Sequence, residues 1–396
     1  MQVQLISASE LTDDLVRTWL HLQREDPALD SPFFCPQFTQ TAAAVRNDVE
    51  VALMAEGNQV RGFFPFQRGA AGRGQPVGAP FSEFHGVVAC CKLKWTPAEL
   101  LAKCGLRCWA YDHLPTSLPQ FAQYHRRVGD SPCIDLSAGF EAYCETKRRA
   151  GSAVISQAGR KARKLARDLG PLRFELHCSD EAVLEKLLMW KSLQHQRTGV
   201  LDVFRFDWVK RFLRKVRDTR NDDFSGMMSV LFAGNDAVAV HLGLRNRAVA
   251  HVWYPAYDPR WAKYSPGMSL FVELARELAN QGVQRIDLGP GPQRYKRSLQ
   301  TGAVQVAIGT VDRWPAARWA RRRWTNARGW FEQLPLRDQV QAPAKMLFRA
   351  RQWLALRIGD QGRDLGQGPG IRAEIRDQGL GIREKAFESN ASDIFG

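Results

Sequence analysis

The chain has 396 residues, 44% of them hydrophobic, which is enough to build the cores of two ordinary domains. No run approaches the roughly 18 apolar residues that a spanning helix needs, and the start, MQVQLISASE, lacks the pattern of a signal peptide. These features exclude a transmembrane protein, a disordered chain and a small disulfide scaffold. We therefore expect a cytoplasmic protein.

The net charge of +15 is concentrated in two segments. Residues 147–167 carry eight Lys and Arg and no acid, and residues 313–357 carry eleven against Glu332 and Asp338. The rest of the chain is close to neutral, which argues against nucleic acid as a partner and favours two local anionic contacts.

The eight cysteines are scattered, and Cys104 with Cys108 has no second pair downstream at zinc-site spacing. We expect reduced thiols and no metal.

The first half predicts mixed helices and strands. Helical spacing runs through residues 12–26, and a hairpin with Gly57-Asn58 at its turn is expected over 49–68. Strands are also expected over 77–91, 106–114 and 131–137, with a short helix over 96–105 between them.

Residues 139–170 change to an amphipathic helical pattern, with apolar positions such as Ile155 and Leu165 on one face and basic residues on the other. This predicts a basic linking helix over 146–170.

The second half repeats the style of the first. A strand, two helices and a three-stranded meander over 229–258 precede a helix over 265–282, a strand, a helical turn and a closing strand. The hairpin through Gly234-Asn235 matches the one through Gly57-Asn58, which indicates a duplication; a chance resemblance between two short hairpins is the alternative. We predict an α/β (α+β) protein with mixed sheets, divided as follows: an N-terminal half 1–145, the linking helix 146–170, a C-terminal half 171–312, a Trp/Arg-rich helical extension 313–358 and a flexible tail 359–396.

The helix expected from residue 265 begins with a candidate anion site. Ser265 is placed as the N-cap and Pro266 as the first helical residue, so free backbone N–H groups and the helix dipole meet near Gly267. An ordinary capped helix is the alternative. P-loop, G-x-G-x-x-G, G-x-S-x-G and H-E-x-x-H motifs are absent.

Several segments in order carry a family resemblance: VLFAGNDAVAVHLGL, WYPAYDP, YSPG and IDLGPG followed by YK, preceded by FFPF, PVGAPFSEF, WAYDHL and SPCIDLS. Together they resemble the GNAT acetyltransferase domain of the cellulose-biosynthesis CelD-like family, over about residues 30–312. The resemblance implies two tandem GNAT-like domains, similar to Fem-type peptidyltransferases.

The resemblance also implies acyl transfer from acyl-CoA, acetyl-CoA in the first place, by an N-acyltransferase of exopolysaccharide or cellulose biosynthesis that acts on a sugar or amino sugar. The pyrophosphate loop of the superfamily maps onto Tyr264, Ser265, Pro266, Gly267 and Met268. Its single glycine leaves larger acyl-CoA or aminoacyl-tRNA open as donor. An aminoacyl-tRNA-dependent Fem-like transferase and a non-catalytic accessory subunit of a polysaccharide synthase are the alternatives.

Direct attack on a thioester needs a base and an acid, and the second half offers candidates for both. His241 stands within an apolar strand, where it is either the base or a core histidine. Asp258 and Asp287 follow strands, and each is either catalytic or a partner in a turn or ion pair. Tyr295 is expected to protonate the leaving thiolate, and Lys296 to bind a phosphate.

Candidate acceptor-binding residues are polar or aromatic side chains at element ends. Trp109, Asp112 and His113 lie near one strand end, with Ser82, Glu83 and His85 in a neighbouring loop. Arg197 and Tyr257 complete the set: Trp109, Asp112, His113, Arg197 and Tyr257. Packing is the alternative reading for Trp109 and its neighbours.

The extension 313–357 contains five Trp among its arginines. Such a segment either packs on the body as helices, contacts nucleic acid, or lies at the inner membrane or against a polysaccharide synthase, which would make the protein peripheral.

Overall fold

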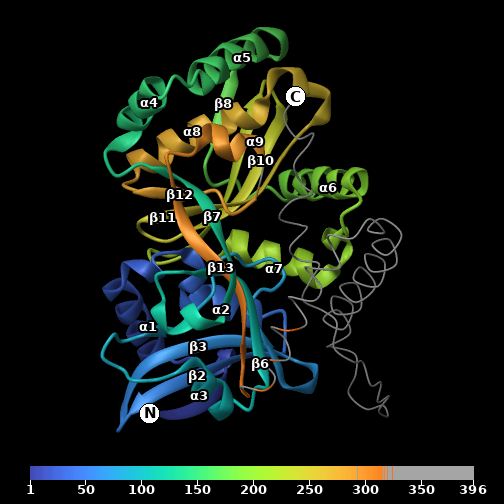
Figure 1. Cartoon of the computed structure of the whole chain (residues 1–396). Coiled ribbons are helices and arrows are strands. Elements are labelled where there is room, and N and C mark those ends of the chain that lie inside the picture. The colour runs from blue at the N-terminus through green and yellow to red at the C-terminus, as the bar shows by residue number, and fades with distance from the viewer. Residues whose placement is uncertain (292, 315, 317–318, 320–322, 324–396) are drawn as a thin grey trace.

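The computed structural model describes residues 1–291, 293–314, 316, 319 and 323, and shows two halves with a similar element order (Figure 1). The first half contains β1 (Gln2–Ser7), α1 (Asp13–Glu25), α2 (Pro36–Ala43), β2 (Val49–Glu56), β3 (Gln59–Gly69), β4 (Arg73–Gln75), β5 (Val88–Ala89), α3 (Pro97–Lys103), β6 (Cys108–Pro115) and β7 (His125–Asp135). The second contains β8 (Leu172–Glu175), α6 (Glu181–Thr198), α7 (Asp207–Asp218), β9 (Ser225–Ala233), β10 (Asp236–Arg245), β11 (Val249–Tyr257), α8 (Pro266–Asn280), β12 (Arg285–Asp287), α9 (Arg294–Leu299) and β13 (Gly302–Asp312). The predicted α/β class with two tandem halves is confirmed.

The two halves share one continuous sheet because they exchange their last strands. The order is β1-β2-β3-β4-β6-β13-β7-β12-β11-β10-β9-β8. Thus β13 of the second half pairs with β6, and β7 of the first half pairs with β12. Figure 1 shows both strands crossing the middle of the molecule. The division predicted at residues 145 and 171 separates the halves along the sequence. In space, the part of the sheet that belongs to each half includes a strand from the other half.

The duplicated hairpins form as predicted. Glu56 pairs with Gln59 and Ala233 with Asp236, which leaves two-residue turns. Gly57 and Gly234 open these turns with φ of 59° and 57°, a conformation that glycine adopts at little cost.

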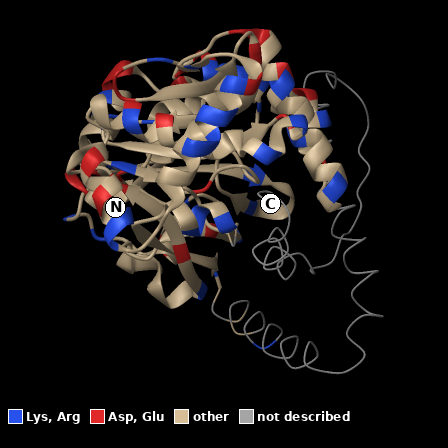
Figure 2. Ribbon diagram, turned by 90° about the horizontal axis from the view of Figure 1, so that it is seen from above, with Lys and Arg blue, Asp and Glu red and all other residues tan. Residues whose placement is uncertain are grey.

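The predicted helix over 146–170 is wrong in its bounds, because two helices stand there. α4 spans Gly139–Arg149 and α5 spans Val154–Leu169, with Gly151 at a φ of 70° in the break. α5 buries Ala158 and Leu165 and packs against α8 of the second half. Its Arg160 and Arg163 remain exposed, and Figure 2 looks onto this end of the molecule with Lys and Arg in blue.

An aromatic core joins the halves. Phe38 of α2 lies 5.8 Å from Phe212 of α7 between ring centroids, and Phe33 lies 6.0 Å from Trp253 of β11. Burial of such rings contributes about 1.5–3 kcal/mol each. We therefore treat the halves as one packed unit.

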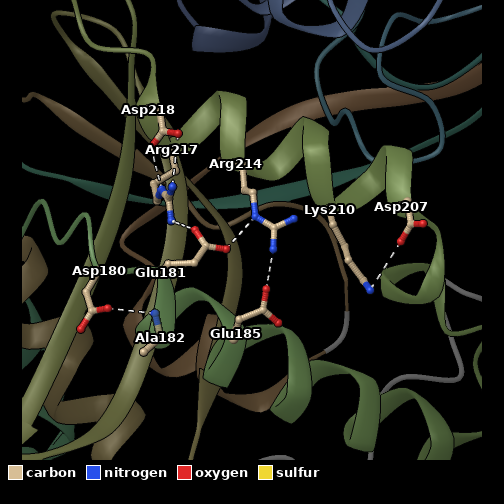
Figure 3. A network of polar contacts seen from close by, with 9 residues as sticks. All are labelled: Asp180, Glu181, Ala182, Glu185, Asp207, Lys210, Arg214, Arg217 and Asp218. Atoms are coloured by element: carbon tan, nitrogen blue, oxygen red, sulfur yellow. Dashed lines mark hydrogen bonds and ion pairs between the residues drawn. The ribbon is translucent and has the colours of Figure 1, made fainter.

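Ion pairs fix α6 against α7 (Figure 3). Arg217, nearly buried, lies 2.7 Å from the Glu181 carboxylate, and Arg214 reaches both Glu181 and Glu185. Among the helices in the described ranges, none combines the length and apolar content needed to cross a membrane. The predicted extension and tail lie almost wholly outside the described residues.

Candidate functional site

The first element of the candidate site is a pair of parallel strands of unequal length. β11 and β12 pair only over Val249–His251 with Arg285–Asp287, where β12 ends, and β11 continues to Tyr257 paired with β10 alone. Trp253 is a bulge residue, since Leu242 of β10 faces Tyr254 and Gly243 faces Val252. Bulges re-aim backbone groups next to functional sites, so this part of β11 offers main-chain groups in an opening wedge.

The first half closes this wedge through the loop that follows β4. The indole N–H of Trp253 donates to the Phe81 carbonyl at 2.8 Å. Two residues on, a carboxylate oxygen of Glu83 lies 2.8 Å from Nε2 of His251, whose side chain is fully buried. Phe33 and Phe84 pack their edges against the His251 ring. Residues from both halves thus meet at one point.

Glu83 is the centre of a charged cluster. Burial raises its pKa, but the nearby His251 imidazole and Lys296 ammonium outweigh burial, so the pKa falls below the usual 4.5. The Glu83 side chain keeps 23% of its surface exposed. An ionised carboxylate with one accessible oxygen can bind or deprotonate an amine or hydroxyl.

Cations and phenols surround this carboxylate. Burial, followed by the Glu83 charge, raises the pKa values of Tyr254 and Tyr295. Burial also lowers the pKa of Lys191 on α6 to about 8, helped by the positive charge of Lys296. Tyr295, one of the predicted catalytic residues, therefore stands in the field of Glu83, and its ring stacks on Phe271 at 5.3 Å.

Lys296, predicted to bind a phosphate, contacts main-chain carbonyls of the loop after β12. It is buried, and its ammonium donates to the carbonyls of Gly289 and Pro290 at 3.1 and 2.9 Å. This fixes the loop after β12. Gly289 has a φ of 72° there, and a Cβ on it would lie 2.1 Å from the Glu83 carboxylate.

Asp287 is fully buried in an ion pair within its own strand. Arg285 Nε lies 2.9 Å from its carboxylate, and another Arg285 nitrogen donates to the Asp30 carbonyl at 2.6 Å. Burial raises the Asp287 pKa despite this partner. The ion-pair interpretation of Asp287 thus has geometric support, with Arg285 as the partner.

His241 lies on the α8 side of β10, on the same face as Gly243 as strand alternation predicts. It is fully buried, neither ring nitrogen has a hydrogen-bond partner, and the ring faces Phe271 at 6.2 Å. Burial, with the neighbouring His251, lowers its pKa to about 3. These facts describe a neutral core histidine.

The start of α8 differs from the predicted cap. Ser265 has a φ of 48° and no capping bond from its side chain; its hydroxyl instead accepts from Lys161 of α5 at 2.7 Å. The Tyr264 hydroxyl donates to Asp168 of the same helix. Pro266 and Gly267 are buried, while Met268 is partly exposed. α5 therefore forms one wall of the candidate anion site.

The remaining second-half residues lie at the far end of β11. Asp258 caps the turn that follows: its carboxylate accepts from the backbone N–H of Arg260 at 3.0 Å and pairs with the guanidinium at 2.6 Å. Arg197 is exposed at the end of α6. Burial raises the pKa of Tyr257, and the positive charge of Arg197 partly opposes that rise.

In the first half, the structure separates Trp109 from the polar residues around it. Trp109 is buried, 5.2 Å from Phe64, which favours the packing interpretation of this residue. Asp112 and His113 are partly exposed and meet His85, with His85 Nε2 2.8 Å from the Asp112 carboxylate.

The sequence analysis missed His251, the nearest partner of Glu83. The sequence pattern that could have identified His251 is the one that identified His241: a histidine within an apolar strand, here AVAHVWY.

A comparison with protein families finds a match in the second half. Residues 152–297 match the family model described as Acetyltransferase (GNAT) domain. This segment is therefore similar to a GNAT acetyltransferase domain. The protein is accordingly an acyltransferase.

Solved structures of similar fold cover both halves. FemX is 8% identical, with a TM-score of 0.52, covering 81% of this chain and 99% of FemX. The C-terminal DUF2156 domain of a protein described as a lysylphosphatidylglycerol synthetase, from Agrobacterium fabrum, is 15% identical, with a TM-score of 0.49 and coverage of 77% and 93%. A tandem GNAT protein from the clavulanic acid pathway is 11% identical, with a TM-score of 0.45 and coverage of 79% and 99%. At these identities the likeness to FemX concerns the fold alone. No curated protein matches the chain.

Proposed function

We propose that the protein is an acyl-CoA-dependent N-acyltransferase whose reaction takes place at the wedge between β11 and β12. The observation that carries the proposal is that β12 ends beside His251 while β11 continues through the Trp253 bulge, with Glu83 of the first half held 2.8 Å from His251. The wedge suits a narrow acyl chain, and the helix start suits a pyrophosphate.

The chemistry follows from the groups at the wedge. The acceptor nitrogen attacks the thioester carbonyl, a C–N bond forms and the C–S bond breaks. Glu83 takes the proton from the nitrogen, and Tyr295 supplies a proton to the leaving thiolate. A backbone N–H at the Trp253 bulge stabilises the oxyanion. We place the base at Glu83 rather than at His241, because the latter is sealed from solvent.

The acceptor we propose is an amino sugar of exopolysaccharide or cellulose biosynthesis. Glu83 supports an amine acceptor, since its carboxylate is ionised and partly exposed. The polysaccharide pathway is supported by the sequence resemblance, and acetyl-CoA is the donor to test first.

A charge-only pair of variants tests the donor site. Met268→Glu places a carboxylate in the first turn of α8, where the helix dipole favours it but a bound pyrophosphate is repelled. Met268→Gln has the same shape without the charge. Calorimetry should show that Met268→Glu binds CoA at least about 10-fold more weakly than Met268→Gln does. Equal affinities in two folded variants would refute the assignment of this helix start.

The exposed basic face of α5 favours a second candidate, an aminoacyl-tRNA donor. Arg160, Arg163, Lys164 and Arg167 are exposed on the helix that walls the start of α8. tRNA binding that falls steeply with salt, in a protein that does not bind acyl-CoA, would support this donor. Binding of neither would support the accessory-subunit role.

A further inference from the structure

A second polar cluster lies in the first half, outside the proposed acyl-transfer chemistry. His85 belongs to the loop after β4, and Asp112 and His113 belong to β6. One donor atom from each of the three side chains lies within 4.8 Å of the other two. The His85 side chain is 2% exposed, and those of Asp112 and His113 are 20% and 15% exposed.

A bulge in β6 explains why neighbouring residues point to the same place. Leu114 pairs with Ala307 and Tyr111 with Gly309, so Asp112 and His113 together face one residue of β13. In a regular strand their side chains would lie on opposite faces. Bulges re-aim side chains in this way, and they are features of functional sites.

The third residue is held in place by the main chain. The backbone N–H of His85 donates to the His113 carbonyl at 3.2 Å. Its Nε2 lies 2.8 Å from the Asp112 carboxylate, and Nδ1 of His113 lies 3.4 Å from the same oxygen. The three donors are therefore arranged before any ligand arrives.

Two imidazoles and one carboxylate form a donor set that suits divalent transition metals. Zn²⁺ binds histidine nitrogens and carboxylate oxygens at about 2.0–2.2 Å, so donors around a tetrahedral ion lie roughly 3.4 Å apart. The observed separations of 2.8 and 3.4 Å need only small adjustments. Three protein ligands would leave a fourth position for water or substrate.

The surroundings permit access and include one competing cation. Asp112 lines one hollow together with Arg127, and His85 lines another with Phe84 and Pro65. The Arg127 guanidinium is positive, so a metal ion must bind against its charge or share the carboxylate with it. A carboxylate ligand with a second partner is common around metal ions.

We propose that His85, Asp112 and His113 form a binding site for a divalent transition-metal ion, with Zn²⁺ as the preferred ion. The sequence analysis expected no metal because it considered cysteine spacing, whereas these donors come from a loop and a bulge 27 residues apart. The site uses none of the groups assigned to acyl transfer, although the His113 imidazole is close enough to help lower the pKa of Glu83.

Metal binding by the full-length protein tests the proposal directly. After chelation and dialysis, Zn²⁺ is titrated in competition with a chromophoric chelator, and Co²⁺ is added separately to record its visible absorption. We expect one ion per chain. Asp112→Asn and His113→Ala should each weaken Zn²⁺ binding at least about 10-fold and change the Co²⁺ spectrum.

Two controls separate this site from adventitious binding. His21→Ala removes an exposed histidine of α1 beside Glu25, and Cys91→Ser removes an exposed thiol. Both should bind Zn²⁺ as the unmodified protein does. Asp112→Asn keeps its size, and its melting temperature without metal shows whether it folds. Equal Zn²⁺ affinity in folded Asp112→Asn, loss of binding in Cys91→Ser, or no binding by the unmodified protein would each overturn the proposal.

Discussion

Replacing Gly289 tests whether the position of Glu83 sets the reaction rate. A Cβ at residue 289 would lie 2.1 Å from the nearest Glu83 oxygen, whereas real contacts of a Cβ almost never fall below 3.0 Å. In Gly289→Ala the carboxylate must move by about 1 Å, and we expect this movement to disturb its 2.8 Å contact with His251. A misplacement of this size costs about 100-fold in rate.

A matched glycine separates this effect from backbone strain. Gly282, between α8 and β12, has a φ of 79° close to the 72° of Gly289, but a Cβ there would meet nothing within 4 Å. Both alanine variants pay roughly 1 kcal/mol for the left-handed conformation. Melting temperatures should therefore fall in both, while the turnover of acyl-CoA, followed by thiol release, should fall only in Gly289→Ala.

A double-mutant cycle supplies the refuting result. Glu83→Gln alone should lower turnover by about 10²–10⁴-fold. If Gly289 acts through Glu83, adding Gly289→Ala to Glu83→Gln should cost little more. Fully multiplicative losses, or equal turnover in Gly289→Ala and Gly282→Ala, would contradict the reasoning.

Three further predictions concern the core, the charge cluster and the extension. His241→Leu should keep at least half of the turnover at neutral pH. It should also lose less stability on acidification than the unmodified protein, because the folded pKa of about 3 lies below the usual 6.5 and the unfolded chain alone binds the proton between them. Urea unfolding at pH 7 and 4 measures this. Glu83 has a lowered pKa, so it stabilises the fold above pH 4.5 and this contribution disappears as the pH falls through the folded pKa. In the same experiment, the free energy of unfolding of Glu83→Gln should fall less on acidification than that of the unmodified protein. Finally, the basic segment 313–357 should bind anionic vesicles in low salt, at roughly 1 kcal/mol per basic residue at the surface, and truncation after Asp312 should abolish sedimentation while preserving CoA affinity. Full-length protein that stays in the supernatant would remove the membrane proposal.

The sequence predicted the regular parts of the fold because their signals are local. Gly57-Asn58 and Gly234-Asn235 specify tight turns between apolar runs, and the hydrophobic alternation around His241 specifies its face. The matching hairpins also pointed to the duplication.

The loop after β4 was predicted wrongly, and the reason is physical. Residues 77–91 were expected to form strands, but within them only Val88 and Ala89 do. The preceding residues make their contacts with distant segments instead: Phe81 with Trp253, Glu83 with His251, and His85 with Asp112. Such long-range pairings leave no periodicity, so local patterns misassign the segment.

The strand exchange gives this loop its place in the candidate site. Because β7 and β13 lie side by side at the centre of the sheet, neither half can close its own sheet without the other. The interface between the halves is therefore fixed by main-chain ladders as well as by aromatic packing, and a loop of the first half meets a strand of the second at a constant position. A carboxylate held within 2.8 Å of His251 needs that rigidity. The first half thus supplies the wall from which Glu83 reaches His251 of the second half.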